Sequence, residues 1–247
     1  MKMIHRYIIE TRQKHPLHFT LLDPGKMNAD DLVGLAKQTA EAGTDGFLIG
    51  GSTDLSLEKV DASVDAIKDI THLPVILFPT HASSVSGHAD AIFFMSLLNS
   101  ESRQFLVGEQ IASARWVKKT GLEPLSMAYL VVAPGMAAGK VGQAQPLPRD
   151  DPTLVVSHAL AGQYLGMKYI YLEAGSGASI PVPSEIIEAV RNEVESLLIV
   201  GGGIKTPEAA AQAVKAGADI IVTGTLVETS NELKEEMSSL IKSIHLG

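Results

Sequence analysis

The amino-acid sequence predicts a single α/β domain over residues 1–247, folded as a (β/α)8 barrel of the TIM type with a missing or modified third helix. Short apolar runs alternate with helical segments, which is typical of parallel strands covered on both faces. The length of 247 residues is close to the roughly 250 of one such barrel. Two glycine-containing loops follow the last two predicted strands, where barrels of this class bind phosphate.

Those last two strands and the helix between them have the clearest local signals. The apolar run 197–200 ends in Gly201, Gly202 and Gly203, and the run 220–222 ends in Thr223, Gly224 and Thr225. Between the two runs, Thr206 and Pro207 are typical of the cap and first position of a helix that extends to Lys215. Glycines that follow a strand let the backbone approach a ligand, and exposed N–H groups there bind phosphate. Tight turns without a ligand are the alternative.

The other elements are predicted from apolar runs and from helix start and stop signals. We expect further strands over 18–22, 46–49, 74–78, 91–95, 126–132 and 169–172, and helices over 4–14, 30–41, 57–70, 101–120, 153–165, 184–194 and 231–244. The segment 79–90 is short and rich in Ser, Gly and His, so we expect an irregular connection there in place of the third helix. The segment 133–151 has little regular pattern and is expected to be a functional or mobile loop.

Composition narrows the class of protein. Apolar residues make up 45% of the chain, and the net charge is −8 with both signs mixed, which disfavours a nucleic-acid partner held by charge. Cysteine is absent, so thiolate catalysis and Cys-ligated metals are excluded. The sequence has neither an evident signal peptide nor an apolar run of 18 residues. We therefore expect a soluble, cytoplasmic protein without a transmembrane segment.

Asp23 directly follows the first apolar strand, where the active-site end of a barrel is expected. Ser52 and Thr53 follow the neighbouring second strand. A carboxylate with hydroxyls, waters and phosphate oxygens is a common way to hold Mg²⁺. Asp23 is therefore a candidate metal or catalytic residue, and the alternative is a turn residue before Pro24.

Glu173 follows the sixth apolar strand and precedes Gly175, Ser176 and Gly177. A carboxylate buried there is costly unless it is paired or takes part in chemistry. We expect a general base or a group that orients a substrate hydroxyl, with a structural ion pair as the alternative. Tyr171 lies two residues earlier in the strand and faces the same way.

The histidines show no short-range metal motif, because neither H-E-x-x-H nor H-x-H occurs. His81 follows the third strand and is close enough to the predicted site to be a candidate, although a solvated loop residue is the more common role. We assign no function to His5, His15, His18, His72, His158 or His245.

Seven segments resemble the archaeal geranylgeranylglyceryl phosphate synthase family of prenyltransferases, in order and over nearly the whole chain. They are LLDPGK (21–26), GTDGFLIGGST (43–53), ADAIFFMSLLNS (89–100), YLVVAPG (129–135), YLEAGSG (171–177), IVGGGI (199–204) and IVTGT (221–225). The combination of YLEAGSG with ADAIFFMSLLNS is far more specific than either glycine loop.

The resemblance implies a (β/α)8 barrel with a modified third helix that joins the C3 hydroxyl of sn-glycerol 1-phosphate to geranylgeranyl diphosphate and releases diphosphate. This is the first ether-bond step of archaeal membrane phospholipid biosynthesis, and its product passes to the membrane. The resemblance also implies dimers or larger rings such as hexamers. It implies Mg²⁺ held by Asp23 and Ser52, a catalytic Glu173 with Tyr171, and glycerol phosphate bound by Tyr171, Leu172, Glu173, Ala174, Gly175, Ser176, Gly177, Gly202, Gly203, Gly224 and Thr225.

Three alternatives remain open from the sequence. A heptaprenylglyceryl phosphate synthase would take a longer prenyl chain, a metal-free phosphosugar isomerase would share the glycine loops, and a non-catalytic phosphate-binding protein would leave Glu173 without a task. The chain has GGSTD (50–54) where some family members have SGTQ, so either Ser52 or Thr53 offers the metal-binding oxygen, and position favours Ser52. Phe93, Phe94, Met95, Leu97 and Leu98 are candidates for a prenyl trough or for ordinary barrel core.

Overall fold

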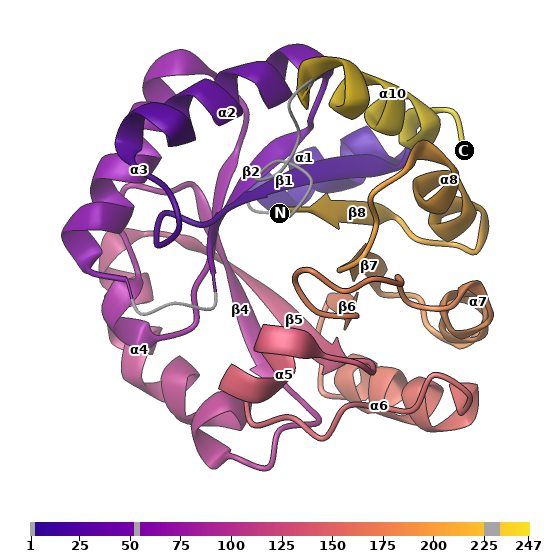
Figure 1. Cartoon of the computed structure of the whole chain (residues 1–247). Helices are drawn as coiled ribbons and strands as arrows, with labels where there is room; N and C mark the ends of the chain where they lie inside the picture. The colour runs from indigo at the N-terminus through magenta and orange to yellow at the C-terminus, as the bar shows by residue number, and fades with distance from the viewer. Residues whose placement is uncertain (1–2, 52–54, 225–232) are drawn as a thin grey trace.

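A computed structural model describes residues 3–51, 55–224 and 233–247. Within these residues, eight parallel strands pair in sequence order, and β8 pairs with β1 to close the barrel (Figure 1). The strands are β1 (Leu17–Leu22), β2 (Gly46–Gly50), β3 (Val75–Phe78), β4 (Ala91–Leu97), β5 (Glu123–Val131), β6 (Tyr169–Glu173), β7 (Leu197–Gly201) and β8 (Ile220–Thr223). The predicted TIM-type fold is confirmed.

The predicted helices occur in the expected order around and beneath the barrel, and α5 is an additional helix (Figure 1). They are α1 (Met3–Arg12), α2 (Ala29–Ala42), α3 (Leu57–Ile70), α4 (Glu109–Thr120), α5 (Met136–Val141), α6 (Pro152–Tyr164), α7 (Ser184–Glu193), α8 (Pro207–Lys215) and α10 (Leu233–His245). The bounds of α8 are those expected, because the Thr206 side chain caps it by accepting from Ala209 N and Pro207 occupies its first turn.

The connection from β3 to β4 contains only the 3-10 turn η1 (Ala82–Ser84), so the modified third helix is confirmed. Helix α4 compensates for the missing helix by making polar contacts with this connection. Glu109 accepts a hydrogen bond from Ala82 N at 2.6 Å, and Trp116 Nε1 donates to Val85 O at 2.8 Å. The irregular segment is thereby held against the barrel without a full crossover helix.

Two connections differ from those that the sequence predicts. The predicted helix over 101–120 is divided into the π-helical segment η2 (Gln104–Gly108) and α4. The segment 133–151, expected to lack a regular pattern, contains α5. Helix α5 has only six residues, and two of them are Gly139 and the β-branched Val141, so its sequence carries little helical signal.

Side chains of each strand divide between two layers, as the pleat requires. Inward-facing residues such as Phe19, Phe93, Met127 and Tyr171 form the interior of the barrel. Outward-facing residues pack against the helices in two clusters, one beneath α2, α3 and α10 and one beneath α6, α7 and α8. This division determines which strand residues can reach the open mouth of the barrel.

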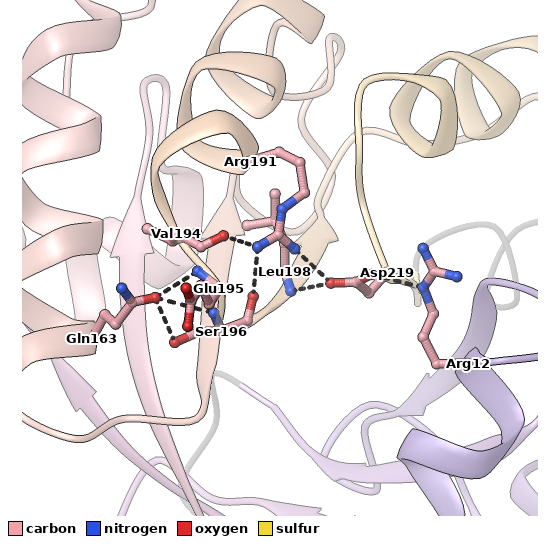
Figure 2. Close-up of polar contacts among 8 residues, drawn as sticks. All are labelled: Arg12, Gln163, Arg191, Val194, Glu195, Ser196, Leu198 and Asp219. Carbon is pink, nitrogen blue, oxygen red and sulfur yellow. Dashed lines mark hydrogen bonds and ion pairs between the residues drawn. The ribbon is translucent and has the colours of Figure 1, made fainter.

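The amino-terminal ends of the strands are closed by α1 and by a charged network. Ile4 and Ile8 of α1 join the interior core, and Ile4 N donates to Glu123 Oε2 at the start of β5. Figure 2 shows Asp219, just before β8, between Arg12 of α1 and Arg191 of α7. Asp219 Oδ2 also accepts from Leu198 N at 2.8 Å. One carboxylate thus connects α1, α7 and β7 at this face.

Candidate active site

The carboxyl ends of β1, β5 and β6 bring Asp23, Tyr129, Tyr171 and Glu173 to the opposite end of the barrel. Tyr129 and Tyr171 are register partners on neighbouring strands, and their rings lie 5.0 Å apart. Tyr171 also stacks on Phe78 of β3, with 5.6 Å between ring centroids. These packed aromatic side chains form a rigid floor beneath Glu173.

Glu173 is the last residue of β6 and is only 6% exposed. Its carboxylate accepts from Gly175 N at 2.6 Å and from the hydroxyl groups of Tyr171 and Tyr129. Burial raises the pKa of Glu173, and these three hydrogen bonds only partly oppose that effect. A carboxylate with a raised pKa is a stronger base than an exposed glutamate, and its oxygens are fixed in position.

Two cavities meet at Glu173. The larger has a volume of about 140 Å³ and a mainly apolar lining that includes Phe78, Met95, Leu97, Phe105 and Val141. The smaller, of about 40 Å³, is lined by the glycine loops after β7 and β8 and by Lys205. Leu21, Glu173, Ser176 and Gly224 line both cavities. The geometry therefore suits an apolar ligand and a small anionic ligand that meet beside one carboxylate.

The smaller cavity has the features of a phosphate pocket. Gly202 and Gly203 both have positive φ angles, which turn the backbone after β7 around the cavity. A β-carbon at residue 202 would lie 2.6 Å from Gly175 N and would clash with Glu173 Oε1. Only glycine therefore allows the β7 loop to lie this close to the Glu173 carboxylate.

Asp23 lines the larger cavity across the mouth of the barrel and is buried. Its Oδ1 accepts from Gly25 N at 2.9 Å, and Lys26 Nζ lies 3.7 Å from Oδ2. Asp23 therefore has both the turn contact and the cavity position that the sequence left as alternatives. A β-carbon at Gly51 would clash with the Asp23 carboxylate, so the end of β2 approaches it closely. The Asp23 carboxylate oxygens at the larger cavity fit the preference of Mg²⁺ for oxygen ligands.

The structure brings most of the expected site residues together, although Gly175 and Gly177 line neither of the two cavities. Ser176, Gly202, Gly203 and Gly224 line the small cavity. Leu172 and Ala174 instead belong to the core layer that faces the helices, so their side chains point away from the cavities. Ser52, Thr53 and Thr225 lie outside the described residues.

Three residues at the site were not singled out from the sequence. Tyr129 binds Glu173, Lys26 lies beside Asp23, and Lys205 lines the phosphate-sized pocket. Tyr129 is the first residue of the YLVVAPG segment, and Lys26 and Lys205 each follow a predicted site loop by a few positions. Closeness in sequence to these segments is the signal that could have identified the three residues. His81 lines neither of the two cavities at Glu173 and instead contacts Glu109 at 3.1 Å.

This geometry defines a TIM-barrel protein in which a buried carboxylate separates an apolar cavity from a glycine-lined pocket. Comparison with known proteins identifies the family. The chain belongs to the PcrB family, whose model matches residues 7–244.

The chain is similar to proteins named geranylgeranylglyceryl phosphate synthase. That of Thermococcus gammatolerans is 49% identical over 245 residues, with 97% of each chain covered. The solved structure of (S)-3-O-geranylgeranylglyceryl phosphate synthase from Thermoplasma acidophilum, in complex with substrate sn-glycerol-1-phosphate, is 42% identical with a TM-score of 0.96, and each chain is covered completely. The tryptophan synthase alpha chain of Legionella pneumophila, at 16% identity and a TM-score of 0.67 with 99% and 97% of the chains covered, shares the fold.

Proposed function

We propose that this chain is a Mg²⁺-dependent prenyltransferase that joins sn-glycerol 1-phosphate to geranylgeranyl diphosphate and releases diphosphate. The observation that carries the proposal is the position of Glu173 between an apolar cavity and a glycine-lined pocket. A prenyl chain matches the first in polarity, and a phosphate group matches the second in size. Relatives bearing the synthase name, at 48 to 49% identity, support the same reaction.

The glycerol phosphate is held, in this proposal, by the loops after β7 and β8. Backbone N–H groups near Gly203 and Gly224 would bind the phosphate oxygens, and the Lys205 ammonium would offset their charge. This places the glycerol hydroxyl toward Glu173. The buried Tyr129 and Tyr171 hydroxyls keep the Glu173 carboxylate oriented before the substrate arrives.

The proposed chemistry forms one carbon–oxygen bond and breaks another. The glycerol C3 oxygen attacks the allylic C1 carbon as the bond from C1 to the diphosphate oxygen breaks, and Glu173 takes the hydroxyl proton. Phe78 and Phe105 line the apolar cavity and would shield the positive charge that develops on C1 from water. Asp23 would hold Mg²⁺, which neutralises the leaving diphosphate when bound.

Product formation followed by mass spectrometry tests this function. The protein is mixed with Mg²⁺, sn-glycerol 1-phosphate and geranylgeranyl diphosphate. Parallel reactions use the 3-phosphate enantiomer, a heptaprenyl donor, or a chelator. The expected product is geranylgeranylglyceryl phosphate, formed only with Mg²⁺ and the 1-phosphate. Product with the longer donor alone would establish the heptaprenyl reaction instead, and no product with any donor would contradict the proposal.

The Asp23→Asn variant tests the proposed Mg²⁺ ligand. It keeps the size of the side chain and its contact with Gly25 N but removes the negative charge. We expect the Mg²⁺ concentration for half-maximal rate to rise at least about tenfold, since ligand charge sets affinity for hard cations. Asp65→Asn is the control, because Asp65 pairs with His88 on the exposed surface. Equal Mg²⁺ dependence in the two variants would remove Asp23 from the metal site.

A further inference from the structure

Two histidines and an aspartate meet at the end of the barrel opposite Glu173. His15 precedes β1, Asp45 directly precedes β2, and His245 is the last residue of α10. One potential ligand atom from each residue lies within 4.8 Å of the others, and these three are the one such group of His, Asp and Glu side chains among the described residues. We call these three residues the lower cluster. They are far apart in sequence, so only closure of the barrel and docking of α10 bring them together.

Each oxygen of the Asp45 carboxylate faces a different imidazole. His245 Nε2 lies 3.0 Å from Oδ2, and His15 Nε2 lies 4.0 Å from Oδ1. The two imidazole rings are next to each other, with 4.0 Å between their centroids. Tetrahedral coordination with bonds of about 2.0–2.1 Å separates ligand atoms by roughly 3.4 Å, which lies within the range of separations seen here.

Other hydrogen bonds already orient these ligand atoms. His15 Nδ1 lies 2.9 Å from the Pro16 carbonyl oxygen, which can only accept, so in the neutral imidazole the proton is on Nδ1 and Nε2 can offer its lone pair to a metal ion. Asp45 Oδ2 accepts from His18 N at 2.8 Å, and Tyr7 donates to the Asp45 carbonyl oxygen. Metal-binding histidines usually have this kind of outer partner.

The lower cluster is partly buried yet reachable from solvent. The side chains of His15 and His245 are 25% and 26% exposed, and that of Asp45 is 11% exposed. An ion can therefore enter without unfolding of the barrel. Partial burial also strengthens the attraction of the Asp45 charge for a cation.

We propose that His15, Asp45 and His245 form a second metal site that binds a divalent transition-metal ion, with Zn²⁺ as its representative. Two imidazole nitrogens and one carboxylate oxygen suit Zn²⁺, and water would complete a tetrahedral set. Mg²⁺ prefers oxygen ligands, so this site differs in selectivity from the proposed site at Asp23. On binding, the proton that His245 Nε2 shares with Asp45 moves to Nδ1 or to solvent.

The proposed ion would have a structural role. It would connect α10 to the segments that lead into β1 and β2, at the face of the barrel away from Glu173. Helix α10 otherwise packs through its apolar side against α2 and α8. A bound ion stabilises the folded state in proportion to the logarithm of its concentration over its dissociation constant. We therefore expect binding to raise thermal stability and to leave turnover unchanged.

Calorimetric titration of ZnCl₂ into the full-length chain tests the site. Millimolar Mg²⁺ is kept present so that oxygen-rich sites are occupied, and thermal unfolding is measured in parallel. We expect one Zn²⁺ per chain and a higher unfolding temperature. His15→Gln and His245→Gln should each weaken Zn²⁺ binding at least about tenfold. Titration with Co²⁺ should give the visible absorption of a tetrahedral complex, and that band should disappear in both variants.

His88→Gln is the matched control. His88 also faces a carboxylate, that of Asp65 at 2.9 Å, but it belongs to a pair on the surface. This variant should bind Zn²⁺ as the unmodified protein does. Three results would overturn the proposal, and the first two are an absence of Zn²⁺ binding by the unmodified protein and equal binding in the His15, His245 and His88 variants. A metal-independent loss of stability in the His15 and His245 variants, without a Zn²⁺-dependent shift, would mean that the cluster is only a hydrogen-bonded contact.

Discussion

At the scale of single residues, Glu173 illustrates how a site can oppose the stability of its own fold. Its carboxylate is buried, and its pKa is raised because burial disfavours the charged form more than its hydrogen bonds favour it. Ionisation of Glu173 in the folded protein therefore costs free energy. In the proposed function, this cost is accepted because it provides a base that is held in position beside both cavities.

The Glu173→Gln variant separates these two effects. We expect turnover to fall by about 10²- to 10⁴-fold, because the amide cannot accept the hydroxyl proton. We expect thermal stability at neutral pH to be equal or higher, since a neutral side chain keeps the shape without the buried charge. Steady-state rates and thermal unfolding measure the two quantities. A variant with full turnover would show that Glu173 is not the base.

The same raised pKa predicts the acid side of the rate profile. Glu173 must be ionised to act as a base, so turnover should fall as the pH drops through its raised pKa, above the ordinary value of 4.5. The stability effect has the opposite sign: protonation is favoured in the folded state, so the Glu173 contribution to stability decreases as the pH rises through that pKa. A rate profile that is flat down to pH 4.5 would contradict a raised pKa of Glu173.

At the scale of elements, the proposed phosphate-binding role of the loop after β7 depends on its close approach to the end of β6. Gly202 has φ of +81°, and a β-carbon there would clash with Glu173 Oε1. The short distance is therefore a property of the β7 loop and the end of β6 together. Replacement of this glycine should affect the site before it affects the barrel.

We expect Gly202→Ala to raise the KM for glycerol phosphate and lower turnover, each at least about tenfold, because displacement of the Glu173 carboxylate disturbs a preorganised geometry. The matched control is Gly166→Ala. Gly166 has a similar φ of +83° but no atom within 4 Å of the added β-carbon. Backbone strain should cost both variants about 1 kcal/mol of stability, the clash should add to this loss in Gly202→Ala, and only Gly202→Ala should lose activity. Similar kinetics in the two variants would contradict the role of the loop.

A second element-scale feature is the junction at Asp219, where α1, α7 and β7 meet. Asp219→Ala removes a buried carboxylate and leaves Arg12 and Arg191 without their shared partner. We expect a loss of about 3 kcal/mol in the free energy of unfolding, measured with denaturant. Glu41→Ala is the control, since its ion pair with Lys234 is exposed and should contribute little. Equal losses of unfolding free energy in the two variants would mean that the Asp219 contacts stabilise the fold no more than an exposed ion pair does.

At the scale of the whole molecule, stability should depend on pH through His18. This side chain is fully buried between the Thr44 and Thr223 hydroxyls, and burial lowers its pKa to about 3. The unfolded chain binds a proton on His18 near pH 6.5, whereas the folded chain does not. The stability that neutral His18 provides is therefore complete above about pH 6.5 and is lost as the pH falls from there toward 3.

Denaturant unfolding between pH 5 and pH 6.5 tests this dependence. The His18 contribution to the slope should approach about 1.4 kcal/mol per pH unit near pH 5 and fall to about half of that at pH 6.5, and His18→Gln should remove it even if the variant is less stable overall. His158→Gln is the control, because His158 is a partly exposed residue of α6 whose ring contacts only a backbone carbonyl of its own helix, that of Leu154. An unchanged slope in the His18 variant would show that another group controls stability in this range.

The sequence by itself was sufficient to predict the barrel, its irregular third connection and the strand-end positions of Asp23 and Glu173. These features depend on local signals: apolar periodicity, the Thr206 cap, and glycines after strands. Local signals were weakest at α5 and at the π-helical start of α4.

Only the tertiary structure decided which side chains meet. Tyr129 binds Glu173 because β5 and β6 pair in the register that places Tyr129 beside Tyr171. His15 and His245 meet because the barrel closes and α10 packs beside its first strands. Both contacts join residues far apart in sequence, and such contacts depend on strand register and helix docking, which no short stretch of sequence encodes.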